Sequence, residues 1–205
     1  MCDLLVPIHL TEGHDRPTAH SQLQGWTVSM IKSLALLAMI ASAPAIAQTS
    51  APLIPDYGKF AEIADPFEAV DPSLRYRIVF DVSQPARKAG EVHQGLERVA
   101  RMVNLLARHG AAPQAGDIVV TIHGPAAKFT LSEAAFAKRF EGETNPNAEL
   151  IRQLTAAGVS VRLCGQSMAA NGFAREELNP DVRVDVSAIT TIATLQLKGY
   201  AIIQD

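Results

Sequence analysis

The sequence predicts an α/β fold in which helices cover both faces of a parallel sheet of five strands. Two observations support this fold class. Segments with the composition of strands and of helices alternate along residues 76–203, and the connections have the length of helical crossovers. The segment D-I-V-V-T-I at 117–122 is apolar almost throughout, which is typical of a strand in a sheet covered on both faces.

Composition places the chain among ordinary globular proteins. It has 205 residues, of which 48% are hydrophobic and 19% are charged, and this predicts a single domain. The formal net charge of -3 gives no reason to expect nucleic acid or an anionic membrane as a partner.

A leader-like segment at residues 30–47 is the exception. M-I-K at 30–32 precedes the apolar run S-L-A-L-L-A-M-I-A-S-A, and A-I-A at 45–47 offers a small-x-small cleavage site. A basic start, an apolar run too short to span a bilayer and such a site are typical of a secretory signal peptide. We expect cleavage near Ala47, a periplasmic or secreted protein and no stable membrane insertion. A buried helix or a retained anchor is the alternative, which Pro44 disfavours.

The remaining boundaries follow from this segment. Residues 1–29 lack periodicity and precede a better start at Met30, so we expect them to be a mis-assigned extension. Cleavage after Ala47 leaves 158 residues, the size of one domain. Residues 48–74 are rich in Pro, Asp and small residues, which predicts an irregular arm before the domain at 75–205. Its aromatic residues are expected to dock it in part: Tyr57, Phe60 and Phe67.

The elements of the domain can be taken in order. The expected strands are short and apolar, and lie at 76–82, 117–122, 159–164, 182–186 and 200–203. Gly110 is placed to end the first helix as a C-cap glycine, and Asn145 and Pro146 predict a capped helix start. Ser187 can cap the last helix. The expected helical segments are 92–109, 126–131, 132–140, 145–157, 166–171, 175–178 and 188–198.

Ligands of parallel α/β sheets bind at the carboxyl ends of the strands. The residues expected there are Asp81 to Ser83, His123-Gly124, Cys164-Gly165-Gln166 and Ser187. Cys164 ends a strand, and a glycine and polar residues able to open a helix follow it. Backbone N–H groups at a helix start favour a thiolate over a thiol. Cys164 and His123 are therefore expected at the same edge of the sheet.

Cys164 is the only cysteine left once residues 1–47 are removed, so the exported protein has no internal disulfide. The residue is a reactive thiol, an intermolecular partner or a buried inert side chain, and free cysteine is often buried. A reactive thiol would be activated by the helix start and by His123 or Lys128. Gly124 would let a ligand approach its backbone. Equally, His123 could be a strand-end histidine that hydrogen-bonds the next loop.

Other site classes fit poorly. The sequence G-Q-S-M-A at 165–169 imitates a nucleophile elbow, but no histidine follows Ser167, as such hydrolases require. The motifs G-x-x-x-x-G-K-[ST], G-x-G-x-x-G and C-x-x-C are absent. None of the histidines after residue 47 has a ligand spacing with Cys164. We therefore expect no metal site and no cofactor.

Several segments together resemble the DsrE/DsrF-like family and look closest to its exported branch. They are Y-R-I-V-F-D-V, G-L-E-R-V-A-R-M-V-N-L-L, V-V-T-I-H-G-P-A, N-P-N-A-E-L-I-R-Q-L-T-A-A-G-V, C-G-Q-S-M-A and S-A-I-T-T-I-A-T-L-Q-L-K-G-Y-A-I-I. The resemblance covers residues 75–205. It implies a three-layer α/β/α fold of Rossmann- or flavodoxin-like architecture with a five-stranded parallel sheet. It also implies symmetric homo-oligomers such as trimers or hexamers.

The resemblance also bears on Cys164. In the sulfur-relay members of the family, a cysteine in the loop after a central strand carries sulfur as a persulfide to a partner protein, and Cys164 is the matching position. Those members work in the cytoplasm and have their own flanking sequence. This chain has the flank C-G-Q-S-M and a signal peptide instead.

We therefore expect a periplasmic DsrE-like protein in which Cys164 accepts sulfur as a persulfide or mixed disulfide, with His123 setting the proton. The expected partners are further copies of the chain and a sulfur-donor or sulfur-acceptor protein. The residues expected to hold the ligand are Gly124, Lys128, Gly165, Gln166 and Ser167. The alternative is a non-enzymatic oligomeric module that binds a small ligand or acts as a scaffold, with Cys164 packed inside. A haem or metal bound through His123 and Cys164 ranks third.

Overall fold

The computed structural model describes residues 51–205. The expected extension at 1–29, the signal peptide at 30–47 and the first residues of the arm lie outside the described residues. Within the described part of the chain, no helix combines the length and the apolar character needed to cross a bilayer.

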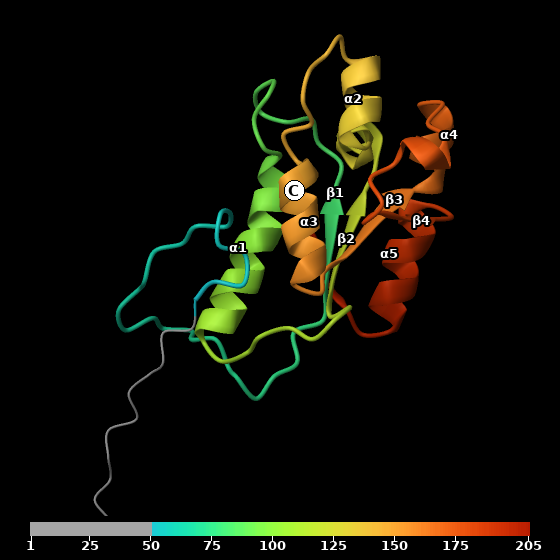
Figure 1. The fold of residues 1–205 in the computed structure, drawn as a ribbon. Helices are drawn as coiled ribbons and strands as arrows, with labels where there is room; N and C mark the ends of the chain where they lie inside the picture. The colour runs from blue at the N-terminus through green and yellow to red at the C-terminus, as the bar shows by residue number, and fades with distance from the viewer. Residues whose placement is uncertain (1–50) are drawn as a thin grey trace, which may run out of the picture. The chain divides into compact units, whose positions relative to one another are not determined.

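The sheet has five strands, all parallel, in the order β4-β3-β2-β1-β5 (Figure 1). The strands are β1 (Ile78–Val82), β2 (Ile118–Ile122), β3 (Ser160–Cys164), β4 (Arg183–Asp185) and β5 (Ala201–Gln204). This confirms the predicted fold class and all five expected strands, with bounds that move by a residue or two.

Helices fill the connections between the strands. They are α1 (Gln94–Arg108), η1 (Gly124–Thr130), α2 (Glu133–Arg139), α3 (Ala148–Ala156), α4 (Gly165–Ala170), η2 (Arg175–Glu177) and α5 (Ala188–Leu197). Gly110 follows α1 with φ +80°, so it ends the helix as predicted. Ser187 accepts the N–H of Thr190 and caps α5, also as predicted.

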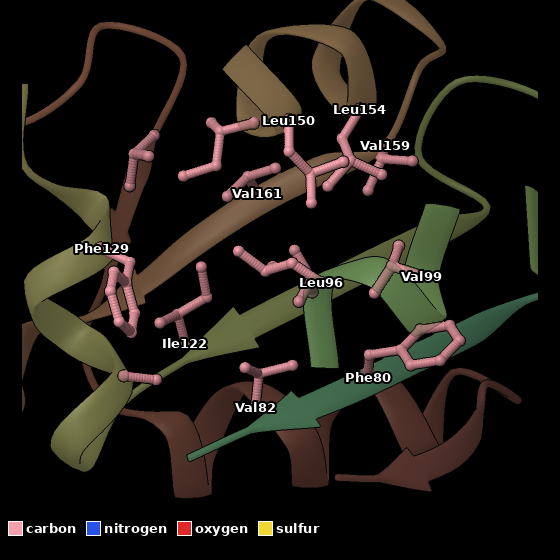
Figure 2. Packing of buried hydrophobic residues seen from close by; sticks show 14 of the residues in the cluster. Phe80, Val82, Leu96, Val99, Ile122, Phe129, Leu150, Leu154, Val159 and Val161 are labelled. Atoms are coloured by element: carbon pink, nitrogen blue, oxygen red, sulfur yellow. The ribbon is translucent and has the colours of Figure 1, made fainter. Parts of the chain in front are cut away.

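One face of the sheet carries most of the core. Alternate strand residues such as Phe80 and Ile122 point to this face and pack against α1 and α3. Figure 2 shows Leu96 and Val99 of α1, and Leu150 and Leu154 of α3, meeting the strand residues there. The packed layer holds the strands in one register and so fixes where each strand ends.

The opposite face is covered by α5 and is partly polar. Leu195 of α5 packs with Val79 and Val119 in a small second cluster. The next residue toward the carboxyl end on this face is Asp81 in β1 and Thr121 in β2, which are paired in the register. Because strand residues alternate between faces, Asp81, Thr121 and the residues two positions further on all lie on the face of α5.

The arm at 51–74 contains no helix or strand, as predicted, but it docks differently. Ile54 is completely buried, and Asn104 of α1 binds both the N–H and the carbonyl of Ile54 at 2.9 Å. Tyr57 and Phe60 are half-buried, whereas Phe67 is fully exposed. The prediction that Phe67 docks the arm was therefore wrong, because the buried anchor is an aliphatic residue held by a polar side chain.

The predicted start of α3 was also wrong. The helix begins at Ala148 with Asn147 as its N-cap residue. Asn145 keeps part of its predicted role, because its Oδ1 accepts the backbone N–H of Asn147 at 3.0 Å. It also donates its amide N–H groups to the carbonyls of Phe129 and Leu131, at 2.9 and 2.8 Å. Asn145 is therefore used to tie the loop before α3 to the end of η1.

Candidate functional site

Two of the predicted site residues lie side by side at the carboxyl edge of the sheet. Ile122 pairs with Leu163 in the register of β2 and β3, so the residues that follow them, His123 and Cys164, end neighbouring strands. Both lie on the face of α5, because each is one residue beyond a side chain of the main core. The expectation that they share an edge is confirmed.

Cys164 is the last residue of β3 and the N-cap residue of α4. Its side chain is free and only 5% exposed. Burial raises the pKa of the Cys164 thiol, but the N–H groups of Ser167, Ala188 and Gln166 and the hydroxyl of Ser167 outweigh it. The net effect is a pKa below its ordinary value, since these donors stabilise the thiolate.

Ser167 connects the thiol to the loop after β2. Its Oγ accepts the backbone N–H of Gly124 at 3.1 Å. With that N–H already donated to the oxygen, the hydroxyl hydrogen is left to point at another acceptor, and the Cys164 sulfur is such an acceptor. The predicted residues Gly124 and Ser167 are thus brought together with Cys164.

The contribution of Ala188 was not predicted. Ala188 is the first residue of α5, and β4, which leads to it, pairs with β3 so that Asp185 is opposite Cys164. The start of α5 therefore lies next to the end of β3. The sequence did indicate that a helix starts here, because Ser187 is a cap residue that follows a strand. That this helix start lies beside Cys164 depends on the strand order.

Gly165 allows this close approach. A Cβ atom at Gly165 would lie 2.6 Å from the carbonyl oxygen of Asp185, closer than Cβ atoms approach other atoms in proteins, and 3.1 Å from that of Val186. Gln166 donates its Nε2 to the same Val186 carbonyl at 3.3 Å. Gly165 and Gln166 thus both contact the link between β4 and α5, and the backbone N–H of Gln166 is among the groups that lower the pKa of Cys164.

His123 makes its side-chain hydrogen bond to Asp81. The Nε2 atom of His123 lies 2.7 Å from Oδ1 of Asp81, and both side chains are partly exposed. Asp81 was expected at this edge, but its sequence context predicted no role for it. Cys164, His123 and Asp81 thus lie at the carboxyl ends of three adjacent strands, β3, β2 and β1 in that order.

Lys128 has a different environment. Its ammonium lies 5.2 Å from the ring centre of Phe129 and 5.3 Å from that of Phe140, within the range of a cation–π interaction. It also lines a cavity of about 270 Å³ with Lys88 and Glu143. The groups that lower the pKa of Cys164 are backbone and hydroxyl donors, whereas the contacts of the Lys128 ammonium are with Phe129 and Phe140.

A metal centre would need several ligands close together. Among residues 51–205, no three His, Cys, Asp or Glu side chains are grouped so that they could hold an ion. Cys164 and His123 do not gain a third ligand from their described neighbours. Asp81 is engaged with His123, which gives this edge the character of a proton-handling pair beside a thiol.

Comparison with solved structures finds proteins of related fold. A protein of unknown function from Methanobacterium thermoautotrophicum, MTH1491, has a TM-score of 0.47 and 22% identity, and the match covers 63% of this chain and 99% of that one. The ychN protein from E. coli has a TM-score of 0.47 and 16% identity, with the same coverage. No curated protein matches the sequence.

Comparison with protein families gives a match over most of the domain. The matched region is residues 75–204, which includes all five strands and every residue of the site. It begins directly after the irregular arm at 51–74. The chain therefore belongs to the DsrE/DsrF-like family.

Proposed function

We propose that the protein is an exported DsrE-like sulfur carrier in which Cys164 accepts sulfur as a persulfide. Membership of the family suggests a role in sulfur relay. The observation that carries the proposal is the set of donors around Cys164, which come from the starts of two helices and from Ser167 and lower the pKa of the thiol. A thiolate is the form that attacks sulfur.

The reaction is a transfer of sulfane sulfur and needs no external oxidant. The Cys164 thiolate attacks the outer sulfur of a donor persulfide, R–S–S–H. A new S–S bond forms on Cys164, and the bond between the two donor sulfurs breaks with release of R–S⁻. Transfer to the acceptor protein is the same step in reverse, with an acceptor thiolate attacking the outer sulfur on Cys164.

The surface near the thiol supports assembly with other protein chains, including copies of this one. Val186, Ile189 and Leu197, at and along α5, are between 76% and 91% exposed. Large apolar side chains in such positions are typical of interaction surfaces. We propose that α5 contacts further subunits, or the donor or acceptor protein, and that the segment 30–47 directs the chain to the periplasm.

The proposal is tested by loading the protein with a low-molecular-weight persulfide and measuring its intact mass. We expect wild type to gain one sulfur atom and to release it to a thiol. In the chain without residues 1–47, the Cys164→Ser variant should gain none, whereas Ser160→Ala, a control at the other end of the same strand where Ser160 binds Arg162, should load like wild type. A Cys164→Ser protein that loads as well as wild type would refute the proposal.

A second function needs no reactive thiol and is favoured by a groove along α5. In this alternative the cysteine is structural and the protein binds a small anion. A groove of about 440 Å³ along α5 has cations of suitable charge in Arg77, Arg162 and Lys198. Alkylation separates the two functions, because a structural cysteine reacts only after unfolding.

A further inference from the structure

We propose that Asp81 is a positioning residue that makes His123 the proton carrier for sulfur transfer at Cys164. The inference rests on the proposed function of Cys164 and extends it to a second residue that the sequence left without a role. It is carried by the hydrogen bond of 2.7 Å between Asp81 Oδ1 and His123 Nε2 and by the register of three neighbouring strands.

The register places the three side chains on one face at one edge. Asp81 of β1 pairs with Thr121 of β2, and His123 is two residues beyond Thr121, so it points to the same face. Cys164 ends the next strand, one position beyond the pair Ile122 and Leu163. His123 therefore stands between the carboxylate and the thiol, on the middle strand of the three.

The hydrogen bond fixes the tautomer of His123. An ionised carboxylate only accepts hydrogen bonds, so the hydrogen of the neutral ring is on Nε2 and the lone pair is on Nδ1. Asp81 is itself held by Gln204, whose Nε2 lies 3.5 Å from Oδ2. Within residues 51–205, Nδ1 of His123 has no hydrogen-bond partner. The ring thus presents a free proton acceptor at the edge where Cys164 lies.

Sulfur transfer requires a group that accepts the thiol proton and later returns it, and Nδ1 of His123 is the group proposed here. No hydrogen bond joins His123 to Cys164 directly, so we propose that Nδ1 of His123 takes the proton of the Cys164 thiol through one water molecule, and the imidazolium is paired with the Asp81 carboxylate. The Cys164 thiolate attacks the outer sulfur of R–S–S–H, the donor S–S bond breaks, and the departing R–S⁻ takes the proton from Nδ1. The products are Cys164–S–S–H and R–SH, and the ring returns to its starting state.

A purely structural role for the pair would be a tie between the ends of β1 and β2. The positioning role and the structural role of Asp81 differ in whether the effect of removing Asp81 depends on His123. If Asp81 acts through His123, removing Asp81 after His123 has gone costs nothing more, as is usual for catalytic groups that act as a unit. If the pair were only a structural tie, each variant would instead lose stability. The tautomer of the His123 ring would then have no effect on the rate of sulfur loading.

The experiment measures single-turnover sulfur loading of Cys164 in wild type, Asp81→Asn, His123→Gln and the double variant. We expect each single variant to slow loading about 100-fold, within the usual range for general acid–base catalysis. The double variant should be no slower than His123→Gln. The control is Asp185→Asn, which removes a carboxylate opposite Cys164 in the register but bonded to Arg162 and Thr191, and it should load like wild type.

The outcomes separate this inference from the proposed function. Wild type that loads no sulfur would remove the proposed function and this inference with it. Wild type that loads while Asp81→Asn loads at the same rate, or while Asp185→Asn is slowed as much as Asp81→Asn, would remove the inference alone. So would a double variant whose losses multiply.

A second readout does not depend on loading. Nitrogen NMR of the His123 ring should show hydrogen on Nε2 in neutral wild type and a mixture of tautomers in Asp81→Asn. A wild-type ring with its hydrogen on Nδ1 would overturn the inference whatever the loading rates are.

Discussion

Removing the hydroxyl of Ser167 is the sharpest test of how the fold sets the reactivity of Cys164. In Ser167→Ala the sulfur loses a side-chain donor, while the N–H of Gly124 loses its acceptor. A hydrogen bond to a charged group contributes about 1.5–3 kcal/mol. Since 1.4 kcal/mol is a factor of ten in an equilibrium constant, the thiolate population below the pKa should fall about tenfold to a hundredfold.

The assay is alkylation of native protein by iodoacetamide across a pH series, read by intact mass. We expect the midpoint of Ser167→Ala to move to higher pH than that of wild type, with slower alkylation throughout the acidic limb. The control is Ser160→Ala, which deletes a hydroxyl at the other end of the same strand, where Ser160 binds Arg162. Equal alkylation profiles for wild type and both variants would refute the assignment of Ser167 as a donor to the sulfur.

Three further predictions concern stability. Gly165→Ala should lower the free energy of unfolding by about 1–3 kcal/mol, measured by urea denaturation, because the added Cβ would strike a carbonyl oxygen 2.6 Å away. Ile54→Ala should cost about 2–5 kcal/mol in the same assay, whereas Phe67→Ala should change stability by less than about 0.5 kcal/mol, since Ile54 is buried and Phe67 exposed. Hydrogen bonds from the Arg139 side chain and the Ala174 N–H lower the pKa of Glu177 to about 2. The stabilisation that ionised Glu177 gives the fold is therefore present above the ordinary pKa of 4.5 and is lost as the pH falls toward 2. In acid denaturation, the stability of Glu177→Gln should converge with that of wild type between these two pH values, and a difference that stays constant would contradict the assignment.

Local pattern was sufficient to predict the elements, because alternation and capping are properties of short segments. The five strands, the glycine after α1 and the cap at Ser187 all follow from neighbouring residues. Asn145 shows the limit of such reasoning. Its side-chain oxygen accepts the N–H of Asn147, a local bond that the sequence predicts. Its amide group also bridges to the carbonyls of Phe129 and Leu131, which depends on tertiary structure and has no local signal.

The candidate site was predictable as an edge but not as a set of contacts. The ends of strands can be read from sequence, and this brought Cys164 and His123 to one edge. The donor from Ala188 requires β4 beside β3, and the bond between Asp81 and His123 requires β1 beside β2. Strand order depends on pairing between distant segments, so neither contact has a local signal.

The same approach of chain segments both buries Cys164 and lowers the pKa of its thiol. Gly165 lets the link between β4 and α5 come within contact of the start of α4, and that link leads to Ala188, whose N–H is among the groups that lower the pKa of Cys164. A low exposed fraction is therefore what both functions predict, and it does not favour a structural cysteine over a reactive one. Apolar surroundings alone would raise the pKa of the thiol, whereas the donors around Cys164 lower it. The pH dependence of Cys164 alkylation, and not the exposure of the residue, is consequently the property that distinguishes a sulfur carrier from a binding module.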